Sequence, residues 1–101
     1  MNKYHAKKTE VDGIVFDSRK EANRYSELRL TEKAGVITKL KLQPKFVCMV
    51  NDKKICTYRA DFKYLENGKL VVEDTKGFRT PVYRLKKKLV EALFNIEIVE
   101  T

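Results

Sequence analysis

The sequence predicts an α/β (α+β) domain in which a mixed central sheet is flanked by two helices. Two helix-start signals, at Ser18 and at Thr80-Pro81, enclose a run of short strand-like segments that turns at Asn67-Gly68. This order of hairpin, helix, several strands, helix and strand is typical of domains in which helices pack on a sheet. Each element is supported by local signals of its own.

The first expected elements are a short hairpin and a capped helix. Residues 9–16 surround an Asp-Gly pair, which favours a tight hairpin turn. Ser18 stands three residues before Glu21, and this spacing matches the capping box at the start of a helix. Gly35 is the residue type that most often follows a helix end. We therefore expect a helix that begins at Ser18 and stops at Gly35.

The middle of the chain is expected to form the sheet. Its segments are rich in β-branched and aromatic residues and are separated by turn residues such as Pro44. A three-residue turn at residues 51–53 would place Cys48 opposite Cys56 as free thiols. The strands that we expect to run together in this sheet cover residues 36–43, 45–50, 54–63 and 69–76.

The second helix is expected to begin at Thr80-Pro81, with the threonine as N-cap and the proline in the first turn. Apolar residues then recur at helical spacing, which predicts one apolar face. That face consists of Val82, Leu85, Leu89 and Leu93. Residues 96–99 are apolar enough for a short final strand.

Composition narrows the classes of function. Lys and Arg number 22 against 14 Asp and Glu, and the net charge of +8 predicts an anionic partner, most often nucleic acid. Neither a membrane span nor a signal peptide is visible, so we expect a cytoplasmic protein with no membrane partner. Two cysteines and one histidine are too few for a Cys/His zinc site or for histidine-dependent nucleophilic catalysis. We expect one domain over residues 9–101, preceded by a basic, flexible arm at residues 1–8.

A pair of aspartates is the most specific chemical signal. A two-residue turn at Asn67-Gly68 sets a register in which Asp61 lies directly opposite Asp74. Like charges on directly opposed residues are unfavourable. A divalent cation held by both carboxylates would offset this repulsion, because hard cations such as Mg²⁺ prefer oxygen ligands.

Neighbouring residues extend this candidate metal site. Alternation along the strand places Lys76 on the same side as Asp74, where it would orient a water or stabilise charge on a phosphate. The carbonyl of Thr75 would add a further ligand. The same alternation directs Glu73 to the opposite face, beside Phe62; a one-residue slip of the turn would reverse the choice between the two acids.

These motifs resemble a known nuclease superfamily. Asp61 followed by Asp74-Thr-Lys76 resembles the core of the PD-(D/E)XK nucleases, which have an Asp on one strand and an (Asp/Glu)-x-Lys on the next. The segment Phe16-Asp-Ser-Arg-Lys-Glu21 resembles the first-helix motif of very-short-patch-repair and transposon-end nucleases. Over residues 3–100 the chain is similar to a family of small phage and prophage proteins assigned to this superfamily.

Two positions depart from the superfamily pattern. Ala60 stands where the name-giving proline would be, and Asp74 takes a position more often held by glutamate. The proline varies widely in the superfamily, so its absence does not change the assignment.

The resemblance implies a fold, an activity and a site. It implies a restriction-endonuclease-like core and a Mg²⁺- or Mn²⁺-dependent endodeoxyribonuclease, made by a phage or prophage in the cytoplasm of a bacterial host. Similarity to Holliday-junction-resolvase-like enzymes implies duplex or branched DNA as substrate, a role in phage recombination or replication, and a homodimer. The implied catalytic residues are Glu21, Asp61, Asp74 and Lys76, and the implied metal ligands are Asp61, Asp74, Thr75 and Glu21.

Basic and polar residues outside this cluster are the predicted DNA contacts, because cationic side chains bind phosphates. Most lie on or just before the second helix. The full set is Lys7, Lys8, Gln43, Arg79, Tyr83, Arg84, Lys86, Lys87 and Lys88.

Simpler interpretations stay open at this point. Glu21 is also explained as a helix cap and Tyr83 as a core residue, and the two aspartates as salt-bridged acids on a solvated face. For the whole protein, a second hypothesis is a non-catalytic DNA-binding module with a nuclease-like fold. A third is a phage assembly or host-takeover protein that binds an acidic partner. Both explain the charge, and neither explains two aspartates followed by a lysine.

Overall fold

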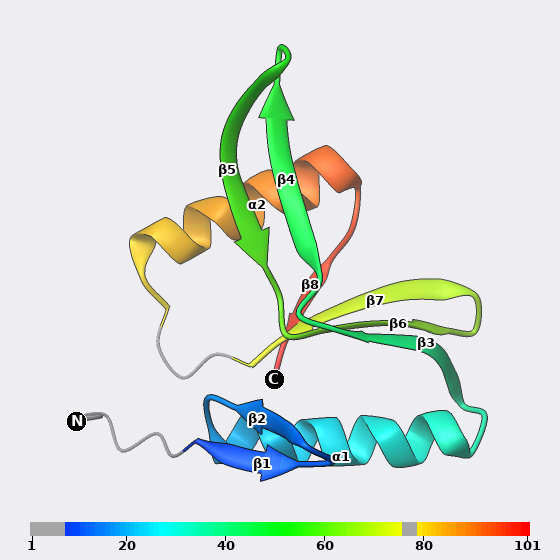
Figure 1. Cartoon of the computed structure of the whole chain (residues 1–101). Helices are drawn as coiled ribbons and strands as arrows, with labels where there is room; N and C mark the ends of the chain where they lie inside the picture. Colours follow the sequence, from blue (N-terminus) through cyan, green and yellow to red (C-terminus); the bar gives the residue numbers. More distant parts are fainter. Residues whose placement is uncertain (1–7, 76–78) are drawn as a thin grey trace.

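A computed structural model describes residues 8–75 and 79–101 of the chain, and these form two helices and eight short strands (Figure 1). The elements, in chain order, are β1 (Thr9–Val11), β2 (Ile14–Phe16), α1 (Arg19–Lys33), β3 (Ile37–Leu42), β4 (Lys45–Val50), β5 (Lys53–Arg59), β6 (Phe62–Glu66), β7 (Lys69–Asp74), α2 (Pro81–Phe94) and β8 (Ile98–Glu100). The predicted mixed α+β class is confirmed.

The central sheet has the strand order β3-β6-β7-β8. Its first three strands are antiparallel, whereas β8 lies parallel to β7. A parallel neighbour requires a crossover connection, and α2 lies in the segment that joins the two strands. The sheet is therefore mixed, as predicted, and is flanked by α1 on one face and by α2 on the other (Figure 1).

The hairpin between β6 and β7 has the predicted register. Asn67 and Gly68 have φ angles of 53° and 76°, as a type I′ turn requires. The pairs run from Glu66 with Lys69 to Phe62 with Glu73, where the ladder ends. Because β6 begins at Phe62, the predicted strand pairing of Asp61 with Asp74 is wrong: Asp61 lies in a bend and donates its N–H to the carbonyl of Glu73 (3.0 Å).

The predicted strand over residues 54–63 is also wrong, because it divides into β5 and β6. Gln43 has a φ of 50°, and Pro44 has no N–H for the central ladder. The bend is held by hydrogen bonds from the Ala60 N–H to the Pro44 carbonyl (3.1 Å) and from the Gln43 N–H to the Asp61 carbonyl (2.9 Å). Strands β4 and β5 consequently leave the central sheet and form a two-stranded sheet of their own.

The β4–β5 hairpin places Cys48 opposite Cys56, as expected, although by a different route. The turn consists of only two residues, Asn51 and Asp52, with φ angles of 50° and 62°. A register shift between Cys48 and Met49 supplies the missing residue. Both cysteines are free thiols.

The helix ends carry the predicted caps. The Ser18 side chain accepts a hydrogen bond from the Glu21 N–H (3.1 Å) at the start of α1. At its end, Gly35 (φ 82°) and Val36 donate to the carbonyls of Glu32 and Thr31, which is the Schellman motif. Thr80 caps α2 in the same way as Ser18 caps α1, with Pro81 in the first turn.

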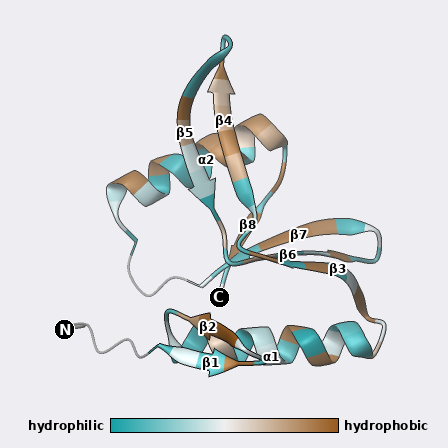
Figure 2. Ribbon diagram, viewed as in Figure 1, coloured by the Kyte–Doolittle hydropathy of each residue, from teal (hydrophilic) through white to brown (hydrophobic). Residues whose placement is uncertain are grey.

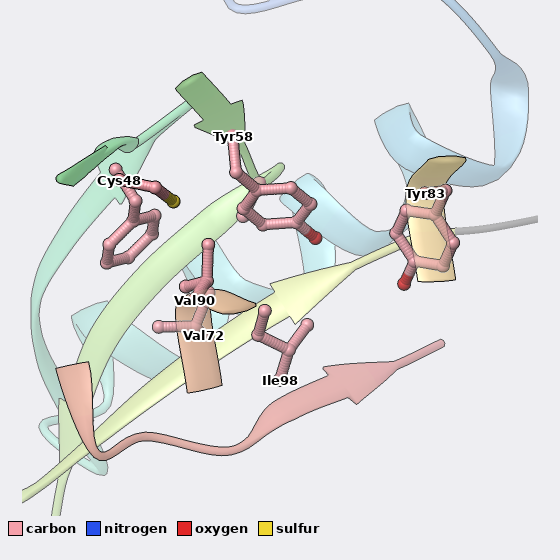
Figure 3. Packing of buried hydrophobic residues seen from close by; sticks show 8 residues of the cluster. Cys48, Tyr58, Val72, Tyr83, Val90 and Ile98 are labelled. Carbon is pink, nitrogen blue, oxygen red and sulfur yellow. The ribbon is translucent and has the colours of Figure 1, made fainter. Parts of the chain in front are cut away.

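Two hydrophobic clusters lie on opposite faces of the central sheet. Beneath α1 are Phe16, Ala22, Tyr25, Leu28, Ile37, Phe62 and Tyr64. On the α2 face are Phe46, Cys48, Tyr58, Ala60, Val72, Tyr83, Val90 and Ile98, and Figure 3 shows this cluster with six of its side chains labelled. The β4–β5 hairpin contributes to this second cluster at its base.

The apolar face predicted for α2 meets the core only at Leu89, which packs against the second cluster. Val82 and Leu85 are 62% and 69% exposed, whereas Tyr83 and Val90 are buried. Both sets recur at helical spacing, so periodicity alone does not choose between them. Packing against the β4–β5 hairpin decides, because the ring of Phe94 meets that of Phe46 edge-on with centroids 5.3 Å apart.

Apolar residues are not confined to the surfaces that face the two clusters. On α2 they lie on more than one side of the helix (Figure 2). In the part of the chain that the structure describes, no helix is both long and apolar enough to cross a membrane.

Candidate functional site

Asp61 occupies the bend between β5 and β6, beside the end of β7. Its Oδ2 accepts a hydrogen bond of 2.6 Å from the backbone N–H of Thr75. This contact fixes the Asp61 carboxylate at the end of β7. The bend thus brings Asp61 near Asp74, as the sequence predicted, although the two residues are not paired in the strands.

Two further acidic side chains, Asp74 and Glu21, lie near Asp61. The pKa of Asp61 is raised from 3.8 to about 7, mainly by burial and further by the negative charges of Asp74 and Glu21, against the opposing hydrogen bond from Thr75. Asp74 acts from the last position of β7 and Glu21 from the first turn of α1. The structure thus brings together three of the four predicted catalytic residues.

Asp74 is fully buried on the α2 face of the sheet. Its Oδ2 accepts a hydrogen bond from the Tyr58 hydroxyl. Burial and this hydrogen bond raise the pKa of Tyr58, so the phenol stays a donor at neutral pH. Tyr58 therefore orients the Asp74 carboxylate.

Glu21 and Asp61 line an open cleft of about 280 Å³. The cleft is bounded by the β1–β2 hairpin and by the end of β3, with Gln43 at its wall. Glu21 is only 7% exposed, so most of its side chain lies against protein. Asp74 does not line the cleft; it lies behind Asp61.

Glu73 has a different environment, although it precedes Asp74 directly. Arg24 binds both of its carboxylate oxygens, at 2.7 and 2.6 Å, and the Tyr64 hydroxyl donates to Oε2. The predicted position of Glu73, beside Phe62 and away from Asp74, is confirmed. This ion pair, between the buried Glu73 and the partly exposed Arg24, joins α1 to the central sheet.

Carboxylates suit a hard divalent cation, and Asp61, Asp74 and Glu21 are of this type. Among the described residues, no three His, Cys, Asp or Glu side chains form a ready-made metal group. The negative charges of Asp74 and Glu21 nevertheless help to raise the pKa of Asp61. A cation bound near the three acids would offset this repulsion and favour the ionised form of Asp61. Thr75 contacts Asp61 through its N–H, and a ligand role for its carbonyl stays a prediction.

Two predicted residues, Lys76 and Lys7, lie outside the described residues. Lys8 is exposed at the start of the described chain, and Gln43 is exposed at the cleft.

The predicted DNA contacts on α2 divide into two groups. Arg84 and Lys88 are exposed. Others bind the protein itself: Lys86 contacts the Thr57 carbonyl (3.4 Å), while Arg79 (3.0 Å) and Lys87 (3.9 Å) contact Glu100. Tyr83 belongs to this second group as well, because it is buried and its hydroxyl donates to Glu100 at 2.7 Å.

Glu100 is the centre of that second group, and sequence reasoning did not identify it. Tyr83 and Arg79 donate hydrogen bonds to it, and together with the charge of Lys87 they lower its pKa. Tyr83 is thus a core residue that offers little surface to a ligand.

Sequence reasoning also missed Tyr58 and Arg24. Tyr58 reaches Asp74 only because the chain bends at Ala60 and Asp61, which alternation along a continuous strand does not predict. The signal for Arg24 was available, since a buried glutamate opposite Phe62 requires a cation or several donors.

The fold and these contacts define a class: a small α/β protein with a cluster of acidic residues at the end of β7 in its central sheet. The chain belongs to the family described as "Protein of unknown function (DUF1064)", whose match covers residues 1–99. No curated protein and no solved structure matches the chain.

Proposed function

We propose that the protein is a Mg²⁺- or Mn²⁺-dependent endodeoxyribonuclease with a restriction-endonuclease-like core of the PD-(D/E)XK type. One observation carries the proposal. Asp61 lines a cleft beside Glu21, and burial, together with the negative charges of Asp74 and Glu21, raises the pKa of Asp61 to about 7. A fold gains nothing in stability from such an arrangement of acids, whereas cation binding requires it.

The residues would divide the work as follows. Asp61 and Asp74 would hold the cation, with Glu21 assisting from α1; when bound, the ion would stabilise negative charge on the scissile phosphate and lower the pKa of a water. Thr75 and Tyr58 fix the two aspartates through the hydrogen bonds described above. Lys76, two positions after Asp74, orients the attacking water.

The substrate is DNA, supported by the net charge of +8. Branched DNA in phage recombination or replication, in the cytoplasm of a bacterial host, is the substrate that the resemblance favours. A homodimer would place two sites on two strands, and the exposed Val82 and Leu85 on α2 offer apolar surface for it. Sedimentation velocity over a range of protein concentrations measures this association.

Cleavage of labelled branched, nicked and duplex DNA in Mg²⁺ or Mn²⁺ tests the proposal. We expect the wild type to cut, and Asp61→Asn and Lys76→Ala to lower the rate by about 100-fold or more. Glu66→Gln removes an exposed acid at the far end of the β6–β7 hairpin and serves as the matched control.

The alternative, a non-catalytic DNA-binding module, gives a different result. A wild type that binds each DNA but cuts none supports the module and contradicts the nuclease. Cleavage that survives both substitutions excludes the site.

A further inference from the structure

The outward face of the β4–β5 hairpin carries basic residues that the candidate site does not use. Burial alternates along β4, so that Phe46 and Cys48 face the core while Lys45 and Val47 face outward. Arg59, at the end of β5, is exposed as well. Lys54, the partner of Met49, continues the positive charge on this face toward the tip, which is hydrophilic in Figure 2.

Lys45 and Arg59 are directly opposed cross-strand partners. Two like charges in this position disfavour the hairpin. An anion bound between them would remove that repulsion and gain attraction from both. A phosphate group is such an anion, and an Arg guanidinium binds two of its oxygens at once.

The pair adjoins the cleft. Lys45 lies two residues from Gln43, and Arg59 lies two residues from Asp61, so the Cα atom of each is at most about 7 Å from that of a cleft residue. The two chains stay paired over this interval through the Ala60–Pro44 and Gln43–Asp61 hydrogen bonds. A strand of nucleic acid held at the cleft would therefore pass next to this pair.

We propose that the outward face of the β4–β5 hairpin binds the sugar-phosphate backbone of nucleic acid. Lys45 and Arg59 bind the phosphate nearest the cleft, and Lys54, which is paired with Met49 on the same face, binds a phosphate farther along. The hairpin projects well beyond the central sheet (Figure 1), and six residues of β4 extend about 20 Å, enough to follow several nucleotides. The exposed Val47 lies between the two basic ends and contacts sugar.

The choice of DNA as the ligand of this surface rests on the proposed function. The surface places the DNA along the β4–β5 hairpin, whereas the sequence predicted most contacts on α2. Lys87 and Arg79 of the α2 region are engaged with Glu100. Lys45 and Arg59 instead face one another across the hairpin with the same charge.

Fluorescence anisotropy with a labelled DNA duplex in EDTA, at several salt concentrations, tests the surface without cleavage. For Lys45→Ala/Arg59→Ala we expect a Kd at least about tenfold higher, and a salt dependence reduced by about one phosphate contact. Lys33→Ala/Lys69→Ala loses the same charge at the end of α1 and at the start of β7, and is the control. If both double variants lose the same affinity, the hairpin surface is contradicted.

Lys45→Glu separates binding from folding. It replaces a repulsive pair by an attractive one, so the melting temperature should stay the same or rise while DNA affinity falls. Unchanged affinity for this variant contradicts the proposal.

The DNA cleavage assay distinguishes a failure of the proposed surface from a failure of the proposed nuclease activity. If the hairpin variants lose binding and the wild type never cuts, the surface stands and the nuclease fails. If they bind and cut like the wild type, the surface fails and the nuclease stands.

Discussion

Glu73 and Asp74 are consecutive in β7, yet their carboxylates lie on opposite faces of the central sheet and have different partners. Glu73 is bound by Arg24 on the α1 face, and Asp74 accepts a hydrogen bond from Tyr58 on the α2 face. Burial is the main cause of the raised pKa of Asp61, and the charge of Asp74 adds to it together with that of Glu21. The first acid therefore stabilises the fold, and the second belongs to the candidate site.

Arg24→Ala should lower the free energy of unfolding by about 3 kcal/mol, because it leaves the Glu73 carboxylate buried without its cation. Urea denaturation measures the change. Arg29→Ala is the control: its partner Glu32 is a neighbour on the surface of α1, and we expect a loss below about 1 kcal/mol. Equal losses for the two variants would contradict the structural role of Glu73.

Asp61 should make stability depend on pH. Its pKa in the folded chain, about 7, exceeds the ordinary value of 3.8. Between these two pH values the folded chain therefore retains a proton that the unfolded chain has lost. The stabilisation is complete below about pH 4 and is lost as the pH rises through about 7. Thermal melts of the wild type should therefore show falling stability from pH 5 to pH 8.

Asp61→Asn supplies the comparison, since an amide keeps an oxygen for the Thr75 N–H and never ionises. Its stability relative to the wild type should rise between pH 5 and pH 8. A constant difference across this range would show that Asp61 does not titrate near pH 7.

Ser18→Ala should lower the free energy of unfolding by about 1 kcal/mol, because the Glu21 N–H loses its capping oxygen. Since the first turn of α1 positions Glu21, the DNA cleavage rate should fall as well. Ser26→Ala removes a hydroxyl that bonds the Ala22 carbonyl within the helix, and should change stability by less than about 0.5 kcal/mol. Equal effects at the two serines would contradict the capping role.

Two substitutions in α2 test which side of the helix faces the core. Val90→Ala should cost about 2 kcal/mol, because Val90 is fully buried. Leu85→Lys should stay within about 0.5 kcal/mol, because Leu85 is 69% exposed. The reverse order, measured by urea denaturation, would restore the apolar face predicted from the sequence.

Local signals predicted the elements well where a short motif determines the backbone. The Asn67-Gly68 turn, the serine and threonine caps and the glycine after α1 act within a few residues, so sequence alone identifies them. The choice of Asp74 over Glu73 followed from such a turn.

Features that depend on tertiary packing were not predictable in this way. The chain bends at Ala60 and Asp61 because Gln43 and Pro44 leave the sheet at the same level, a relation between segments that are distant in sequence. The side of α2 that packs inward depends on the β4–β5 hairpin beneath it. Tyr58 reached the site through that same bend.

Mn²⁺ binding, measured by calorimetry at pH 8, tests the central claim most directly. The wild type should bind the ion, while Asp61→Asn and Asp74→Asn should weaken binding by about tenfold or more, and Glu66→Gln should bind like the wild type. If the aspartate variants bind Mn²⁺ as tightly as the wild type, or if the wild type binds none, the acidic cluster is not a metal site and the proposed nuclease mechanism is wrong.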